Sequence, residues 1–386
     1  MTNFIQSRAV AQFQCLGDQC EDTCCKGWGM QLTRETIAKF EAQAPELLDA
    51  VAQGEAEYVM KRDPQTDYCV KFDAGWCGIH RDYGSDFLGD ACHFFPRITR
   101  AMGDTVLTTA ALSCPESARL MLLEEGGFGW TERADARLPY SMKQYLPESL
   151  SEADALALHE LFVTEAGNPA YTAEVNLMRV STVVQALTMM PAAQWAAAGA
   201  FYFTMAEGRI PAAEAVAADP FNLTHALVGL VNASKASHRP RLQQTIGTIC
   251  EVLGMAVEGA AVSLAPDAAQ RFLGMQHHWR SVPQMQPVLR RYLQAQLSIA
   301  FFPYAGLGAT LPERMSIIGV RFATTKLALM AEARHGSGTP DAGTVIRVVQ
   351  SLSRFLDHLA DPTLSLQIYN EAGWVRESRL RALLME

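Results

Sequence analysis

Residues 13–28 read FQCLGDQCEDTCCKGW and place four cysteines within eleven positions, two of them adjacent. Of the nine cysteines in the chain, eight lie in the first 114 residues and only Cys250 follows. The eight are Cys15, Cys20, Cys24, Cys25, Cys69, Cys77, Cys92 and Cys114. Cysteines that served only as small buried residues would be scattered along the chain. We therefore expect a Cys-rich, metal-binding module over residues 1–123 and a second domain over residues 124–386.

Three interpretations of the early cysteines compete. Disulfides are typical of small secreted domains, whereas this chain is long and opens without a recognisable secretory signal. The second interpretation is that each cysteine is a small buried core residue. It fits Cys250, which lies in the helical pattern TICEVLG, better than it fits four clustered thiols. Thiolates select zinc or iron–sulfur clusters, so we favour a metal site. The pattern C-x4-C-x3-C-C is neither a zinc ribbon nor a ferredoxin spacing, so it leaves the metal and the number of sites open.

The adjacent pair Cys24–Cys25 restricts the backbone. Neighbouring side chains on an extended chain point to opposite sides. These two thiols can therefore share one centre only if a turn separates them. His80 and His93 lie close to cysteines in the sequence and could replace a thiol, although such histidines more often hydrogen-bond a ligand than bind the metal.

Composition and charge narrow the class of protein. The chain has 386 residues, 49% of them hydrophobic and 19% charged, which is ample for a large core. A formal net charge of -9 and the lack of a basic stripe argue against a nucleic-acid partner. The apolar stretches are too short or too interrupted to span a bilayer, so we expect no membrane partner and a cytoplasmic protein.

Apolar residues recur at three- and four-residue spacing through most of the second domain and predict a mostly α fold. Ser151, with Asp154 three residues later, predicts a helix start, and Gly208 predicts a helix end. The pattern of residues 241–259 predicts another helix. DTVLTTAALSC, residues 104–114, is the best strand candidate. We therefore expect an irregular N-terminal module with at most a short hairpin, packed on a helical C-terminal part.

Several motifs taken together resemble a known family. The opening cysteines, followed by YCVKFDAGWCGIHRDYGSDFLGDACHFFPR, resemble the CxxCxxCC family of zinc- or iron-chelating proteins. ALSCPESARLML, residues 111–122, is similar to a segment of the flagellin lysine N-methylase family. RRYLQAQLSIAFFPYAG and VIRVVQSLSRFLDHL are similar to later landmarks of that family. The first cysteine gaps, of four and three residues, are longer than those of the family.

The resemblance implies an enzyme that transfers a methyl group from S-adenosylmethionine to lysine side chains of a flagellin-like protein. It also implies an iron–sulfur cluster, expected to be 4Fe-4S, with zinc as the alternative metal. The eight early cysteines would then be the metal ligands. Trp28, Arg97 and Arg119 would bind the cofactor, and Arg354 is a further matching position.

The rest of the sequence carries no familiar methyltransferase fold. Glu125, Gly127 and Gly129 imitate a nucleotide-binding loop, but the run before them reads as a helix from Pro115 and no strand–helix series follows. The C-x3-C-x2-C triad of radical S-adenosylmethionine enzymes is also missing from the sequence. Methyl transfer would therefore require an unusual way of binding the methyl donor.

A lysine acceptor must lose its proton before it can attack a methyl group, because its ordinary pKa is about 10.4. We predict Glu116 and His358 as catalytic residues, with Tyr292 and Tyr304 as further candidate bases. A protein-lysine N-methyltransferase is thus the expected function. The alternative is a non-enzymatic zinc- or iron-binding module whose helical domain docks a protein.

Overall fold

The computed structural model describes most of the chain. The described residues are 3–54, 58–133, 137–139, 142–147, 149–205, 239–258, 261–336, 338–357, 362–371 and 373–375. The predicted helix end at Gly208 and the predicted catalytic residue His358 lie outside them.

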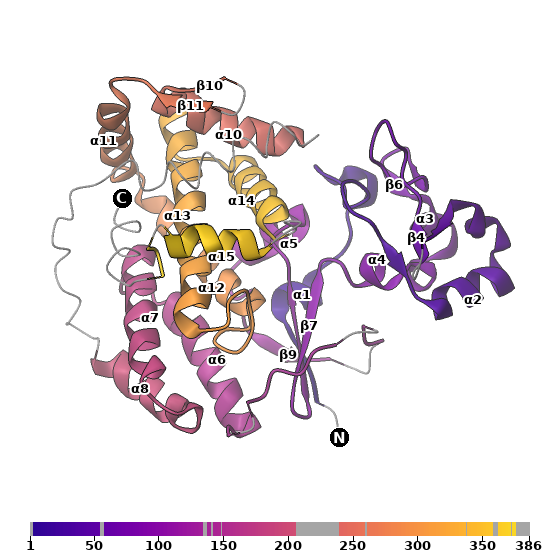
Figure 1. Cartoon of the computed structure of the whole chain (residues 1–386), viewed down its shortest axis with the longest axis horizontal. Helices are drawn as coiled ribbons and strands as arrows, with labels where there is room; N and C mark the ends of the chain where they lie inside the picture. The colour runs from indigo at the N-terminus through magenta and orange to yellow at the C-terminus, as the bar shows by residue number, and fades with distance from the viewer. Residues whose placement is uncertain are drawn as a thin grey trace.

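Helices dominate the described chain, as the sequence predicts (Figure 1). The helices of the C-terminal body are α6 (Glu152–Ala166), α7 (Ala173–Thr188), α8 (Trp195–Met205), α10 (Pro240–Leu253), α11 (Ala268–Trp279), α12 (Gln286–Ile299), α13 (Leu311–His335), α14 (Ala342–Leu356) and α15 (Pro362–Glu371). Short 3-10 turns, η4 (Ala192–Gln194) and η5 (Pro283–Met285), precede α8 and α12. In the described part, no helix is both long enough and apolar enough to cross a bilayer.

Capping residues set the bounds of several helices. The Ser151 hydroxyl accepts a hydrogen bond from the Asp154 backbone nitrogen at 3.1 Å, which confirms the predicted start of α6. The helix predicted over residues 241–259 is too long. Gly254 adopts a left-handed φ of 66°, ends α10 and leads into a hairpin of β10 (Met255–Glu258) and β11 (Ala261–Leu264).

The expectation of at most a short hairpin in the N-terminal region is wrong. A mixed sheet has the order β7-β8-β1-β9. Its strands are β1 (Asn3–Ser7), β7 (Arg97–Met102), β8 (Thr105–Ala110) and β9 (Trp130–Glu132). The predicted strand around β8 does form a hairpin with β7, but β1 then joins β8 in parallel and β9 in antiparallel pairing. Such pairing between distant segments leaves little local trace in the sequence.

Residues between the first cysteines and β7 form a small lobe beside the helical body (Figure 1). Its helical elements are α2 (Arg34–Gln43), η2 (Pro45–Ala50), α3 (Gly78–Tyr83), η3 (Ser85–Phe87) and α4 (Asp90–Phe94). Its strands are β2 (Gln31–Leu32), β3 (Val51–Gln53), β4 (Tyr58–Met60), β5 (Phe72–Asp73) and β6 (Trp76–Cys77). Phe40, Leu47 and Ile79 belong to its own apolar core.

A larger core unites the sheet with the helical body. Buried residues of β8 and of α5 (Pro115–Leu122) pack in one cluster with α12, α13 and α14. The helix α1 (Arg8–Gln12) and the turn η1 (Gly17–Gln19) connect β1 to the cysteines. The main core therefore crosses residue 123, and the domain boundary predicted there stays a prediction.

Candidate functional site

All eight early cysteines line one cavity of about 810 Å³. The opening loop contributes Cys15, Cys20, Cys24 and Cys25, and the small lobe contributes Cys69, Cys77 and Cys92. Cys114 enters from the N-terminus of α5, and Gln350 and Arg354 enter from α14. The cavity therefore lies where the loop, the lobe, the sheet and the body meet.

All nine cysteines are free thiols in this structure. Cys250 lies in α10, far along the chain from the others, and does not line the cavity. Across the described residues, no three His, Cys, Asp or Glu side chains are grouped closely enough to hold a metal ion. The thiols thus share a cavity without forming a closed set of ligands.

The adjacent cysteines lie in a turn, the kind of backbone that a shared centre requires. Cys24 and Cys25 both lie in this turn. The Asp22 carboxylate accepts from the Thr23 nitrogen at 2.8 Å, and the Thr23 hydroxyl accepts from the Cys25 nitrogen at 3.1 Å. These bonds mimic a backbone turn and fix the loop locally.

Three thiols interact directly across the cavity. The Cys25 thiol lies within hydrogen-bonding reach of Cys24 and of Cys77 and donates its single proton to one of them at a time, which raises the pKa of Cys25 and lowers the pKa of the other two. The pKa of Cys77 falls to about 6 because Cys25 donates to it and nearby backbone groups of α3 add hydrogen bonds, against the effect of burial. The lowered pKa of Cys77 favours its thiolate, the form that binds metals.

The remaining cavity cysteines have raised pKa values, which favour the protonated thiols. Burial raises the pKa of Cys20 to about 11 and that of Cys114 to about 12. Burial also raises the pKa of Cys15, Cys69 and Cys92. A bound metal would have to displace these protons, so we expect metal binding to depend on pH.

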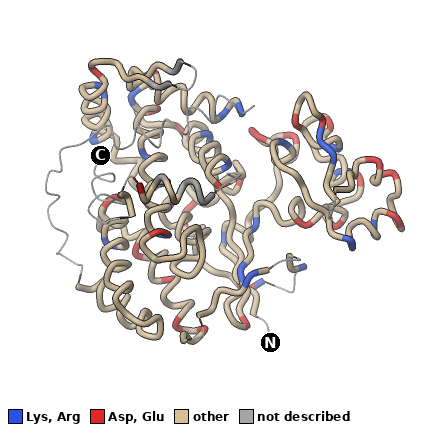
Figure 2. The backbone as a smooth tube through the Cα atoms, viewed as in Figure 1, with Lys and Arg blue, Asp and Glu red and all other residues tan. Residues whose placement is uncertain are grey.

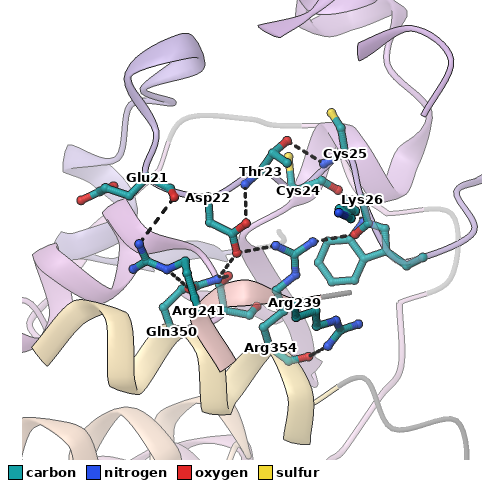
Figure 3. A network of polar contacts seen from close by, with 12 residues as sticks. Glu21, Asp22, Thr23, Cys24, Cys25, Lys26, Arg239, Arg241, Gln350 and Arg354 are labelled. Carbon is teal, nitrogen blue, oxygen red and sulfur yellow. Dashed lines mark hydrogen bonds and ion pairs between the residues drawn. The ribbon is translucent and has the colours of Figure 1, made fainter. Parts of the chain in front are cut away.

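A polar network ties the cysteine loop to the helical body (Figure 3). Arg354 donates to the Asp22 carboxylate at 2.5 Å and to the Lys26 carbonyl at 2.6 Å. Gln350 donates to the same carboxylate at 2.8 Å and accepts from Arg241 at 3.0 Å. Positive charge from Arg354 also helps to lower the pKa of Cys24, after the hydrogen bond from Cys25. The network holds the cysteine loop against α14.

Trp28 lies between the loop and the body. Its indole nitrogen donates to the Cys24 carbonyl at 2.5 Å, and its ring packs edge-on against Phe95 at 5.3 Å. The guanidinium of Arg354 lies 5.2 Å from the centre of the Trp28 ring. Trp28 thus supports the turn that carries the adjacent cysteines.

The other predicted site residues separate into two groups. Arg97 and Glu116 line the cavity, whereas Arg119 does not. Arg119 instead bridges the carboxylates of Glu116 and Glu21. Tyr292 is buried against α13, where it accepts a hydrogen bond from Thr325, and it does not line the cavity.

Tyr304 is also buried and outside the cavity lining. His80 and His93 do line it, and the His93 Nδ1 atom lies 2.9 Å from the Ser85 carbonyl oxygen. Of the predicted bases that the structure describes, Glu116 lines the cavity and the two tyrosines do not, so its catalytic role stays a prediction.

Sequence reasoning missed three residues that shape the site: Asp22, Gln350 and Arg133. Asp22 lies between two predicted ligand cysteines, and Gln350 precedes Arg354 by one helical turn. Both positions could have been recognised from the sequence as candidate site residues. Arg133 follows the last strand of the sheet and carried no sequence signal of its own.

Comparisons with known proteins agree with the resemblance in part. Over 152 residues the chain is 24% identical to the flagellar biosynthetic protein FliU of Salmonella muenchen, covering 37% of this chain and 90% of that protein. Over 148 residues it is 24% identical to the lysine-N-methylases of Salmonella typhimurium and Salmonella choleraesuis, covering 36% of this chain. The match spans 37% of the length of each methylase.

The chain is thus a distant relative of proteins named lysine-N-methylase. No family model matches the sequence. No solved structure matches it either.

Proposed function

We propose that this chain is a protein-lysine N-methyltransferase that uses S-adenosylmethionine and holds an iron–sulfur cluster in the cysteine-lined cavity. The observation that carries the proposal is the convergence of eight thiols, from segments up to about a hundred residues apart, on that cavity. The distant relation to lysine-N-methylases supports the reaction class. The relation to a flagellar biosynthetic protein supports flagellin as the favoured substrate.

The cavity suits an iron–sulfur cluster by its donor chemistry. Its wall carries more soft thiol donors than the four that a single cluster needs, and Cys24 and Cys77 have lowered pKa values. Because the described thiols do not form a closed ligand set, side chains must shift to surround a cluster. When bound, a cluster would supply a Lewis-acidic site for the amine of the methyl donor.

The methyl transfer itself makes one bond and breaks one bond. The neutral lysine nitrogen attacks the methyl carbon, the carbon–sulfur bond of the sulfonium breaks, and the electron pair stays on sulfur as a thioether. The ammonium that forms then loses a proton. We assign this proton to Glu116, one of the carboxylates that line the cavity, whose position is held by Arg119.

Two measurements on protein purified without oxygen test the proposal. A brown, reducible absorbance with stoichiometric iron and inorganic sulfide supports the cluster, whereas a colourless protein with stoichiometric zinc supports the non-enzymatic metal module. Incubation with S-adenosylmethionine and flagellin, followed by mass spectrometry of the flagellin, reads out methylation directly. An iron-loaded protein that adds no methyl group to any lysine-rich flagellin overturns the enzymatic assignment.

A further inference from the structure

Two arginines of the cavity lack the carboxylate partners that the other two have. Four arginines line it: Arg62, Arg97, Arg133 and Arg354. Arg62 pairs with Asp67 and Arg354 pairs with Asp22. Within the described ranges, neither of the remaining two forms an ion pair with an acidic side chain.

The register of the mixed sheet places this pair on one face. Thr99 and Thr108, on β7 and β8, lie opposite each other with their hydroxyl oxygens 3.3 Å apart. Arg97 is two residues before Thr99 and so shares its face. Arg133, just beyond β9, donates across the sheet to the Thr108 hydroxyl at 3.4 Å. Arg97 therefore projects from the same face of the sheet that the Arg133 guanidinium reaches.

The surroundings of the pair are unfavourable for two unpaired cations. Both side chains are half-buried, and Arg97 lies over the Phe13 ring, 5.3 Å from its centre. Burial lowers the pKa of Arg97, and repulsion from Arg133 lowers it further. Burial likewise lowers the pKa of Arg133. Glu132 also lines the cavity, but among the described residues no ion pair joins it to Arg97 or Arg133.

Like charges held together in a cavity wall are stabilised by an anion between them. We propose that Arg97 and Arg133 form a carboxylate-binding subsite that receives the α-carboxylate of an amino-acid-bearing ligand. This rests on the proposed function, in which that ligand is the methionine end of S-adenosylmethionine. Lys and Arg positions (blue) also gather on the sheet between the body and the small lobe (Figure 2).

The competing role for these arginines is to balance the charge of thiolates or of a cluster. Arg97 is close enough to Cys15 for the thiolate to favour the charged arginine. A test must therefore separate recognition of a carboxylate from retention of metal. A ligand pair that differs only by the carboxylate makes this separation.

The experiment compares S-adenosylmethionine with its decarboxylated analogue, which keeps the adenosine and the sulfonium. Full-length protein is purified without oxygen, its iron is measured, and both ligands are titrated by calorimetry. We expect the wild-type protein to prefer S-adenosylmethionine by about 10- to 100-fold, the range of a charge-assisted pair. Arg97→Gln and Arg133→Gln should each remove most of that preference while affinity for the analogue changes less than about 2-fold.

Two sets of variants serve as controls. Arg100→Gln, on the same strand but outside the cavity lining, should keep the wild-type preference. Arg97→Lys and Arg133→Lys keep the positive charge but lose the planar, forked guanidinium. These variants should retain part of the preference for S-adenosylmethionine over its analogue. If the glutamine variants do not fold, the lysine variants and the wild-type ligand pair still decide the question.

The outcomes separate the subsite from the proposed function. Equal affinity of the wild-type protein for both ligands, or a preference that survives both glutamine substitutions, overturns the subsite and leaves the methyl donor in place. If the glutamine variants lose iron but keep the wild-type preference for S-adenosylmethionine, the arginines balance charge at the metal site. That result also overturns the carboxylate subsite. A wild-type protein that binds neither ligand overturns the subsite and the proposed methyl donor together.

Discussion

Arg354, near the C-terminal end of α14, donates to the carboxylate of Asp22 in the cysteine loop across 2.5 Å, although 332 positions separate the two in sequence. Arg354 is only 6% exposed, so its charge depends on this partner. The ion pair joins the last long helix of the body to the segment that carries the first four cysteines. Stability of the fold and retention of a metal should therefore be coupled through this contact.

Removing the arginine should weaken both properties. Arg354→Gln removes the ion pair of the Asp22 carboxylate and leaves its hydrogen bond from Gln350. We expect the free energy of unfolding to fall by about 2–4 kcal/mol, because a largely buried charge loses its partner. Urea unfolding measures the loss, and the iron content of the purified variant should fall with it.

A double-mutant cycle with Asp22→Asn isolates the pair, which should couple by about 1–2 kcal/mol. The exposed pair Arg271–Asp267 provides the control. Arg271→Gln should cost less than about 0.5 kcal/mol, because solvent screens that pair. Additive effects of the two Arg354 and Asp22 substitutions would contradict the proposed coupling.

Serine substitution of the cavity cysteines should lower the bound iron. We expect at least one variant in each of the segments 15–25, 69–77 and 92–114 to lose more than about half of it, because a hydroxyl is a poor ligand for iron. Cys250→Ser is the control, since Cys250 does not line the cavity. Iron and sulfide analysis of each purified variant gives the readout. Full iron in every variant of a segment would exclude that segment from the site.

Replacing the candidate base should slow methyl transfer without weakening binding of the methyl donor. For Glu116→Gln we expect a fall in kcat of about 100-fold, the usual contribution of general-base catalysis, and an unchanged affinity for S-adenosylmethionine. Partial recovery of the rate at higher pH should follow, because solvent then deprotonates the lysine. Glu125→Gln, at a side chain that is 95% exposed, should behave like the wild type. If Glu116→Gln methylates at the wild-type rate, Glu116 is not the proton acceptor.

The buried His159 should make the fold sensitive to mild acid. It lies in α6, fully buried, with its Nδ1 atom 2.8 Å from the Phe302 carbonyl oxygen. Burial lowers the pKa of His159 from 6.5 to about 4. Between those values the unfolded chain binds a proton that the folded chain does not, so the free energy of unfolding falls as pH falls. The expected loss from this group, complete below pH 4, is about 3 kcal/mol.

Urea unfolding at pH 7, 5.5 and 4 measures that slope. His159→Gln should flatten it relative to the wild type, because the glutamine side chain does not titrate. His335→Gln, at the exposed end of α13, should leave the slope unchanged. An unaltered slope in His159→Gln would show that other groups cause the acid sensitivity.

Local patterns in the sequence predicted the helices well. The Ser151 cap and the apolar spacing of residues 152–166 depend on neighbours within four positions, so they act before any tertiary contact forms. Crowding of the cysteines also indicated in advance that they act together. Strand β1 was missed because its five residues pair with β8, about a hundred positions away.

Gln350 and Arg133 were missed for a related reason. Both are ordinary polar residues in their own segments, and only their contacts with Asp22 and Thr108 give them a place in the site. The sequence by itself determined the helical character and the thiol-rich chemistry, because periodicity, capping and composition are properties of short stretches. Only the tertiary structure decided that the eight thiols face one cavity and that two arginines share its wall, because those relationships depend on which distant segments pack together.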